Sequence, residues 1–368
     1  MKELIVDLGQ RSYPVLIGRG LLKSSGNLIS SVIKKGKVLL ISNPTVFPLY
    51  GPEVVASLKE AGYEVIVGLM PDGERFKNIE EAMKILDLGV KAGLQRDSVV
   101  VALGGGVTGD LAGLVAALYM RGINFIQIPT TLLAQVDSSI GGKVGVNHHL
   151  GKNLIGAFHQ PLLVISDTDT LATLEKREYY AGLGEAVKYG IIYNKEFFTW
   201  MENNWEGIVA QNDDCLQEII YQSCLCKAGI VKQDEKETGI RAILNLGHTF
   251  GHSLEKLTDY TSYRHGEAVV LGIIAAGYLA CYQGYLQEQE RKRIENILHN
   301  LGLIYPFPAI DSEKIYMGML NDKKVQEGNL RLIVPRGIGN AEIIANVARE
   351  TVIKAIEAAR EITNTKGI

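Results

Sequence analysis

Val99-Val100-Val101-Ala102-Leu103-Gly104-Gly105-Gly106-Val107-Thr108-Gly109-Asp110 is the segment most indicative of the architecture of this chain. Its first five residues are apolar and mostly β-branched, which predicts a buried strand, and the glycines that follow predict a tight turn. Residues 111–120 then have the apolar character of a buried helix. In a strand–turn–helix unit of this kind, backbone amides and the positive end of the helix can bind a pyrophosphate. Such turns are also common without a ligand, so the glycines alone establish only the local fold.

The same alternation of strands and helices extends to both sides of this stretch. Continuous apolar strands that are separated by helices are typical of a parallel sheet covered on both faces. We predict a helix at residues 78–92 and further strands at residues 37–42, 63–68, 123–128 and 162–166.

The character of the chain changes near residue 170. From Leu171 onward it is rich in Ala, Leu, Glu and Lys at helical spacing, with one strand candidate at residues 330–334 and a helical tail at residues 340–362. We therefore predict an α/β plus α architecture with two domains. Residues 1–169 are expected to form a Rossmann-like N-terminal domain with a mostly parallel sheet, and residues 170–368 a mostly helical C-terminal domain.

The composition is that of an ordinary soluble globular protein. Of 368 residues, 46% are hydrophobic and 21% are charged, and the formal net charge is −3. This balance predicts no general attraction to nucleic acid or to an anionic membrane. We see no leader and no apolar run of membrane-spanning length, and the four cysteines have no spacing typical of a disulfide framework. These features predict a cytoplasmic protein with reduced thiols.

The glycine turn differs in two ways from an ordinary dinucleotide-binding motif. It follows about 100 residues of chain, and no acidic residue ends the next strand at residues 123–128. A bound nucleotide would therefore have its ribose held elsewhere. The best candidate is the turn Asp72-Gly73-Glu74-Arg75-Phe76-Lys77, which offers a carboxylate acceptor and an ammonium donor.

Three of the seven histidines lie close together in the sequence, at positions 248, 252 and 265. His248 and His252 are four residues apart and project from the same face of a helix. A histidine pair with this spacing is more often found on a surface or at a cap, but His265 and the neighbouring glycines favour a metal site. With a carboxylate such as Glu185 within reach, the set suits a divalent ion of the zinc type with one position open for substrate.

A run of small and polar residues, Pro129 to Lys143, directly follows the predicted strand at residues 123–128. Its Gly141-Gly142-Lys143 turn presents an ammonium beside exposed amides, which suits a phosphate or carboxylate. The alternative, a solvated serine-rich turn, is less favoured because the run begins where a strand ends. Lys152-Asn153, Lys227 and Asp322-Lys323-Lys324 add cationic and polar candidates, although each alone is more often a surface feature.

Together, these stretches resemble the 3-dehydroquinate synthase family of sugar-phosphate cyclases. The matching segments appear in family order: GERFK (73–77), GGGVTGD (104–110), YMRG (119–122), PTTLLAQVDSSIGGKVGVN (129–147), GKN (151–153), REYYAGLGEAVKYG (177–190), LNLGHTFGHSLE (244–255), HGEAV (265–269) and DKK (322–324). Departures from the family pattern are small: Glu175 replaces a common proline, and Gly184 a common alanine. Glycine in place of alanine costs a helix about 1 kcal/mol, so Gly184 could loosen the metal site slightly.

The resemblance implies a role for each matching residue. It assigns zinc or cobalt to Glu185, His248 and His265, and it places His252 beside the substrate, which corrects the interpretation of both paired histidines as ligands. The implied NAD contacts are Asp72, Glu74, Lys77, Gly105, Gly106, Val107, Asp110, Thr130, Thr131, Asp137, Ser138, Lys143 and Lys152. The implied substrate contacts are Lys143, Asn153, Lys188, Lys227, Arg241, Asn245, His252 and, in the DKK turn, Lys323. Arg121 would reach the site of a neighbouring subunit in a homodimer.

The resemblance also implies the reaction. The family converts 3-deoxy-D-arabino-heptulosonate 7-phosphate into 3-dehydroquinate and phosphate, in the shikimate pathway. The steps are transient oxidation by NAD, phosphate β-elimination, reduction, ring opening and aldol closure. Three alternatives stay open: an amino-dehydroquinate synthase or another sugar-phosphate cyclase, a polyol dehydrogenase that uses NAD and a metal, and a non-catalytic sensor of nucleotide and zinc.

Overall fold

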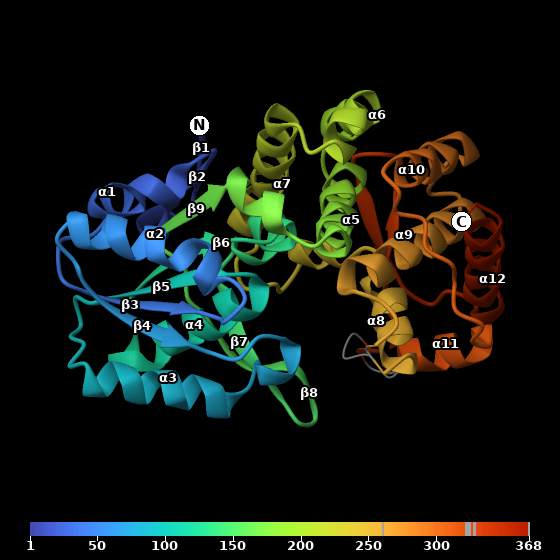
Figure 1. Cartoon of the computed structure of the whole chain (residues 1–368). Helices are drawn as coiled ribbons and strands as arrows, with labels where there is room; N and C mark the ends of the chain where they lie inside the picture. The colour runs from blue at the N-terminus through green and yellow to red at the C-terminus, as the bar shows by residue number, and fades with distance from the viewer. Residues whose placement is uncertain (260, 321–324, 327–328, 367–368) are drawn as a thin grey trace. The chain divides into compact units, whose positions relative to one another are not determined.

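The computed structural model describes residues 1–259, 261–320, 325–326 and 329–366 (Figure 1). Contacts group the chain into two compact units. Unit 1 comprises Met1–Leu174 and Gln217–Lys236, and unit 2 comprises Glu175–Leu216 and Glu237–Ile368. Both units are therefore discontinuous in sequence, and the boundary near residue 169 stays a prediction.

Unit 1 is built on a seven-stranded sheet in the order β1-β2-β9-β6-β5-β3-β4. β1 and β2 pair antiparallel, and the other neighbouring strands pair parallel. The mostly parallel sheet is confirmed, whereas the antiparallel pair at the N-terminus was not predicted. The strands are β1 Lys2–Val6, β2 Tyr13–Gly18, β3 Lys37–Ser42, β4 Glu64–Leu69, β5 Val99–Gly104, β6 Asn124–Pro129 and β9 Leu163–Asp167.

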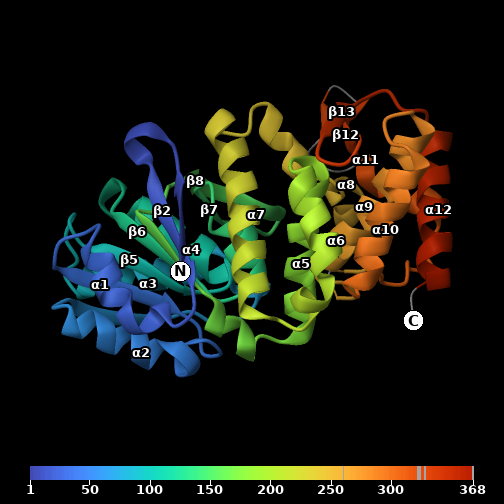
Figure 2. The same ribbon diagram turned by 90° about the horizontal axis from the view of Figure 1, so that it is seen from above.

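Helices cover both faces of this sheet (Figures 1 and 2). Along β3, Leu39 and Ile41 belong to one apolar cluster, and Val38 and Leu40 to the other, as the two-residue period of a strand requires. Both faces are thus buried, which explains why the strands are continuously apolar. The helices are α1 Ser25–Ser30 and α2 Phe47–Glu60 against one face, and α3 Ile79–Lys91 and α4 Gly106–Leu118 against the other.

Three further elements complete unit 1. A π-helical turn at Ala134–Ser138 follows β6 and leads into an antiparallel hairpin of β7 Lys143–His148 and β8 Gly151–Phe158. The hairpin packs against α4 through Val144 and Val146. Most of helix α7, Asp213–Gln233, also belongs to this unit.

Unit 2 is mostly helical, as predicted. Its helices are α5 Lys176–Ile192, α6 Lys195–Val209, α8 His248–Leu257, α9 His265–Tyr282, α10 Glu288–Asn300, α11 Ser312–Leu320 and α12 Arg349–Lys366. Its short strands are β10 Val325–Gln326, β11 Asn329–Leu330, β12 Leu332–Pro335 and β13 Ala341–Ile344. The predicted helical tail at residues 340–362 was partly wrong, because β13 pairs antiparallel with β12 and the helix begins only at Arg349.

α9 is the central helix of unit 2 and packs against α5, α8, α10 and α12. Of the helices in the described residues, it alone is long and apolar enough to cross a membrane, yet 78% of it is buried inside the structure. A helix that is apolar all round is expected in the core of a large domain. α9 is therefore the helix around which the neighbouring helices of unit 2 pack.

Candidate functional site

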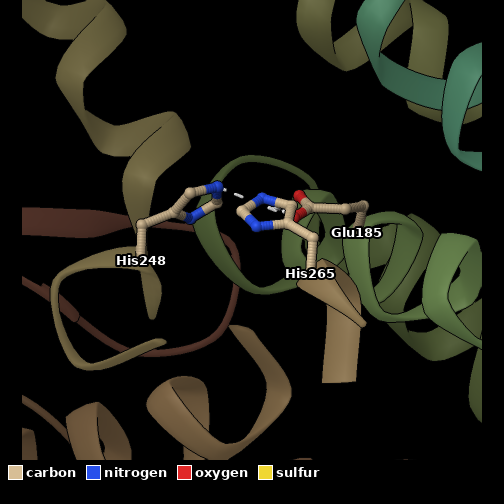
Figure 3. A group of neighbouring side chains, drawn as sticks. All are labelled: Glu185, His248 and His265. Carbon is tan, nitrogen blue, oxygen red and sulfur yellow. Dashed lines mark ion pairs between the residues drawn. The ribbon is translucent and has the colours of Figure 1, made fainter. Parts of the chain in front are cut away.

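Three helices of unit 2 bring Glu185, His248 and His265 together (Figure 3). Glu185 lies in the middle of α5, and the two histidines are the first residues of α8 and α9. One ligand atom from each side chain lies within 4.8 Å of the others. The Nε2 atoms of His248 and His265 lie 3.6 and 3.7 Å from the same oxygen, Oε1 of Glu185.

Close helix packing makes this cluster possible. A Cβ atom on Gly266 would lie 1.9 Å from the carbonyl oxygen of Ala181, so α9 and α5 touch through their backbones. A Cβ atom on Gly272 would similarly lie 2.0 Å from the carbonyl oxygen of Gly247, just before α8. The glycines near the histidines therefore let α9 approach both helices that carry the other two residues of the cluster.

An ion pair fixes the start of α9 on α5. Arg177 donates from Nε and Nη2 to the two carboxylate oxygens of Glu267, at 2.6 and 2.7 Å. Glu267 is 2% exposed and also accepts the backbone N–H of Arg264, which caps α9. A two-pronged contact of this kind sets orientation as well as distance, so it holds His265 in place relative to α5.

The polar environment of Glu185 suits a cation. Its side chain is 1% exposed, and the buried ammonium of Lys188, one turn along α5, forms an ion pair with Oε2. The other oxygen, Oε1, accepts no hydrogen bond from the described residues. A buried carboxylate oxygen without a partner is unfavourable. Two imidazole nitrogens and a carboxylate are also the ligands that zinc prefers when one position stays open.

Other predicted residues of unit 2 lie near this cluster in sequence or in space. The ring of His252 lies 5.5 Å from that of His248 and 5.8 Å from that of His265, between ring centres. Arg241 and Asn245 belong to a 3₁₀ helix, Ile240–Asn245, that leads into α8. The side chain of Arg241 is 1% exposed. Lys323 lies outside the described residues.

In unit 1, the glycine turn lies where the strand order of the sheet reverses. β5 ends at Gly104 and lies between β3 and β6. The strand that follows β3, β4, is added on one side of this pair, and the strand that follows β5, β6, is added on the other. Ligands of open parallel sheets bind at such a position, outside the carboxyl ends of the strands. A Cβ atom on Gly105 would lie 3.0 Å from Thr131, and one on Gly106 would lie 2.9 Å from Ser138. The turn and the polar run after β6 are therefore neighbours, as predicted sites of one ligand should be.

A buried lysine joins the glycine turn to the hairpin. Lys77 is 5% exposed; its ammonium lies 2.5 Å from Oδ2 of Asp110 and donates to Oδ1 of Asn153 at 2.7 Å. Burial raises the pKa of Asp110 above its ordinary value, and the neighbouring ammonium of Lys77 opposes this rise. Asn153 has a φ of 53°, in the left-handed region, which asparagine tolerates better than most residues.

The other predicted residues of unit 1 occupy several places around the turn. Lys227 of α7 is 6% exposed and donates to Oδ1 and to the backbone oxygen of Asp137, both at 2.8 Å. Asp72 accepts the hydroxyl of Thr45 at 2.8 Å. Thr130 donates its backbone N–H to the carbonyl of Gly104, Val107 packs on the core, and Lys143 and Lys152 are exposed on the hairpin.

Arg121 is not brought to this group. It lies after α4, whose 13 residues separate it from the glycine turn by about 20 Å, at the opposite end of β5 and β6. Met120 and Arg121 have φ values of 48° and 68°, so two ordinary residues adopt the left-handed conformation in succession. Such backbone strain is typical of functional positions. The turn presents Arg121 on a surface pocket that Arg96 and His159 also line.

Comparison with known proteins decides the family. Residues 67–181 match the family model for the 3-dehydroquinate synthase N-terminal domain, and residues 182–325 match that for the C-terminal domain. The chain is also 47% identical over 357 residues to a 3-dehydroquinate synthase of Desulforamulus reducens, covering 97% of this chain and 99% of that protein. The chain belongs to the 3-dehydroquinate synthase family. The resemblance in the sequence motifs is thereby confirmed.

Solved structures of sugar-phosphate cyclases share the fold of this family member. A 2-epi-5-epi-valiolone synthase from Streptomyces hygroscopicus subsp. jinggangensis, solved with NAD⁺ and Zn²⁺, has a TM-score of 0.87 at 27% identity, covering 97% of this chain and 99% of that one. A 2-deoxy-scyllo-inosose synthase, solved with carbaglucose-6-phosphate, NAD⁺ and Co²⁺, has a TM-score of 0.85 at 26% identity, covering 98% and 99%. These likenesses confirm the predicted fold class.

Two residues that motif reasoning gave no role lie within the candidate sites of this 3-dehydroquinate synthase family member. Asn147 donates to Oε1 of Glu74 at 2.7 Å and accepts the backbone N–H of Asn153 at 2.9 Å, so it ties the loop that carries Lys77 to the hairpin. Glu255 contacts His265. An asparagine near the end of a strand gives no distinctive signal, whereas a glutamate one turn after His252 could have been noticed from its helical spacing.

Proposed function

We propose that the chain acts as a 3-dehydroquinate synthase. It converts 3-deoxy-D-arabino-heptulosonate 7-phosphate into 3-dehydroquinate and phosphate, as a lyase that holds NAD and one divalent ion, zinc or cobalt. The observation that carries this proposal is the cluster of Glu185, His248 and His265, in which both imidazoles face a buried Glu185 oxygen that accepts no hydrogen bond from the described residues, in a chain of this family.

Glu185, His248 and His265 would hold the metal ion. A bound divalent ion supplies a Lewis acid that lowers the pKa of a coordinated hydroxyl group. Among the chain's own residues, His252 adjoins the two histidine ligands and is placed to contact substrate hydroxyls. Lys188 keeps a buried positive charge beside Glu185, which offsets the negative charge of an ionised substrate oxygen.

NAD would bind at the glycine turn of unit 1. The cofactor supplies a hydride acceptor that later returns the hydride, so it is not consumed. Gly105 and Gly106 leave room for the pyrophosphate against the N-terminus of α4. The remaining contacts are proposed for Asp72, Glu74, Lys77, Val107, Asp110, Thr130, Thr131, Asp137, Ser138, Lys143 and Lys152.

The substrate carries a phosphate and a carboxylate, and cations of the chain would bind both. Lys143 and Lys227 offer ammonium groups, and the guanidinium of Arg241 offers a planar set of donors. Burial of Lys227 and Arg241 strengthens such contacts, because the local dielectric constant is low. Asn153, Asn245 and a lysine of the DKK turn, for which we take Lys323, would complete the set.

Arg121 and the homodimer form a further part of this proposal. Arg121 lies too far along α4 to serve the glycine turn of its own chain, whereas a second copy could receive it. Leu118, Met120 and Phe158, in the region near this arginine, are between 42% and 48% exposed. Exposed apolar groups of this kind are typical of an interface between protein chains.

We place the protein in the cytoplasm. None of the four cysteines forms a disulfide, and burial raises the pKa of the Cys224 thiol to about 12. Unpaired cysteines are typical of a reducing compartment. Fusion of the chain to a fluorescent protein in its host, followed by cell fractionation, tests this placement.

One assay tests the proposed reaction. The zinc-loaded protein is incubated with NAD and 3-deoxy-D-arabino-heptulosonate 7-phosphate, and phosphate release is recorded together with NADH absorbance. We expect phosphate to appear in amounts far above the enzyme concentration, while NADH absorbance stays constant. Net NADH production with glycerol, without phosphate release from the heptulosonate, would instead establish a polyol dehydrogenase.

A further inference from the structure

In both imidazoles of the proposed metal cluster, the nitrogen that faces away from Glu185 also has a partner. Both direct Nε2 toward Oε1 of Glu185, and both place Nδ1 beside an oxygen acceptor. Nδ1 of His248 lies 3.1 Å from the carbonyl oxygen of Leu246, and Nδ1 of His265 lies 3.3 Å from Oε2 of Glu255. Carbonyl and carboxylate oxygens accept hydrogen bonds, so each Nδ1 carries the hydrogen and each Nε2 keeps its lone pair for a ligand.

Glu255 is built into the helix pair that carries the histidines. It lies on α8, one turn after His252, and is 4% exposed. A Cβ atom on Gly251, in the turn before it, would lie 3.0 Å from the backbone of Ala268 on α9. The close packing of the two helices therefore sets the position of the Glu255 carboxylate relative to His265.

We infer that Glu255 is a positioning residue for the metal centre, acting on His265 by accepting its Nδ1–H. This inference rests on the proposed metal site. The carboxylate fixes the tautomer and the ring orientation of His265, and its charge makes Nε2 a stronger donor to the ion. His248 receives the same support from a backbone carbonyl, which no substitution removes. Of the two contacts at Nδ1, only that of Glu255 can therefore be removed by substituting a side chain.

A second metal position is the competing explanation. His252, Glu255 and His265 also offer ligand atoms within 4.8 Å of one another. His265 would then have to give up its Nδ1 proton while Nε2 serves the first ion. A single ion with Glu255 behind His265 leaves the imidazole neutral, which is its common form as a ligand. The structure therefore favours the positioning role.

The test compares metal affinity in Glu255→Gln, Glu255→Ala and the parent chain, by competition with a chromophoric chelator for Zn²⁺ and Co²⁺. Loss of a carboxylate behind a histidine ligand lowers metal affinity by roughly 10- to 100-fold, which we expect for Glu255→Ala. Glu255→Gln keeps an acceptor oxygen but loses the charge, so we expect a smaller loss. The visible absorption of bound Co²⁺ should also shift in both variants.

The matched control is Glu295→Gln. Glu295 is 3% exposed, lies in the same unit on α10, and forms an ion pair with Arg291 rather than with a histidine. Its substitution should leave zinc affinity and the Co²⁺ spectrum unchanged. Thermal unfolding of the metal-free proteins separates a general loss of stability from a loss of metal affinity, and Glu255→Gln decides the question if Glu255→Ala does not fold.

Each result supports or overturns the inference. Zinc affinity within twofold of the parent in Glu255→Gln, with an unshifted Co²⁺ spectrum, would overturn it. So would a second equivalent of bound metal in the parent chain that only the Glu255 variants lose. Failure of the proposed function gives a different result. If zinc affinity depends on Glu255 but the parent chain releases no phosphate, this inference holds and the proposed activity is wrong. If the parent chain binds no metal, both the role of Glu255 and the proposed function are wrong.

Discussion

The candidate site of unit 1 and that of unit 2 differ in how their charges are satisfied before any ligand binds. In unit 1, the buried Lys77 contacts Asp110 and Asn153, and the buried Lys227 contacts Asp137. In unit 2, the carboxylate of Glu185 is also buried and forms an ion pair with Lys188 through Oε2, but Oε1 accepts no hydrogen bond from the described residues. The charges of the first site are thus paired within the protein, whereas the second site has a buried oxygen, facing two imidazoles, that a cation would contact.

The difference follows from how each site is made. The glycine turn presents backbone amides and needs only the strand–turn–helix unit to form. The cluster of unit 2 needs three helices to meet, and they direct two imidazole nitrogens toward one carboxylate oxygen, Oε1 of Glu185. Substitutions in unit 2 should therefore affect metal binding first, and substitutions in unit 1 should affect NAD or substrate binding first.

The largest effect is expected for His265→Ala, which removes one of the three proposed metal ligands. We expect bound zinc to fall well below one equivalent and activity to fall by roughly a thousandfold or more, since a metal ion contributes several kcal/mol to the reaction. Elemental analysis and phosphate release measure the two quantities, and NAD affinity serves as the control. Full zinc occupancy in this variant would refute the ligand assignment.

A large effect on stability is expected for Gly266→Ala, with Gly184→Ala as its matched partner. The added methyl of Gly266→Ala would lie 1.9 Å from a backbone oxygen, so α9 must move from α5, and we expect a loss of about 3 kcal/mol or more. At Gly184 the nearest atoms lie at 2.9 and 3.0 Å, and alanine favours the helix by about 1 kcal/mol. Gly184→Ala should therefore change stability by less than about 1 kcal/mol. Chemical denaturation measures both, and equal losses would contradict the close crossing of the helices.

Lys143→Ala and Lys152→Ala compare two exposed lysines of the same hairpin. Loss of a charge-assisted hydrogen bond costs about 1.5–3 kcal/mol. We therefore expect Lys143→Ala to lower kcat/KM for the heptulosonate phosphate by roughly 10- to 100-fold, much more than it lowers NAD affinity. Lys152→Ala should instead weaken NAD binding. Equal loss of NAD affinity in a titration of Lys143→Ala would count against its role toward substrate.

The smallest effect is expected for Asn147→Ala. Its amide makes two hydrogen bonds, to Glu74 and to the backbone of Asn153. Each is worth about 1 kcal/mol, so NAD affinity should fall roughly three- to tenfold while zinc content stays constant. Fluorescence titration with NADH measures this change. His149→Ala, at the exposed tip of the hairpin, is the control. An identical loss of NAD affinity in that variant would show that the Asn147 amide makes no specific contribution to NAD binding.

Local sequence predicted the parallel sheet well. The strands predicted at residues 123–128 and 162–166 are β6 and β9, displaced by a single residue at each end. A short continuous apolar run is fully buried in a strand that is covered on both faces, so the sequence predicts the bounds of these strands closely. β13 was assigned to a helix because Ala341–Ile344 becomes a strand only by pairing with Leu332–Pro335. The same holds for the N-terminal strands, whose apolar runs are short.

Sequence also indicated the members of the candidate sites more readily than their supports. His248, His252 and His265 attract notice because histidine is rare in this chain. The helical spacing of Glu255 places it near His252, but its contact with His265 depends on how α8 packs against α9. The grouping of residues 217–236 with unit 1 was equally hidden, since it follows from contacts such as that of Lys227 with Asp137.

X-ray diffraction recorded at the zinc absorption edge, from crystals of the zinc-loaded protein, tests the metal centre most directly. The structure predicts one anomalous peak about 2.0–2.2 Å from Nε2 of His248, Nε2 of His265 and a carboxylate oxygen of Glu185. A zinc ion held by other residues, or no ion between these three side chains, would contradict it.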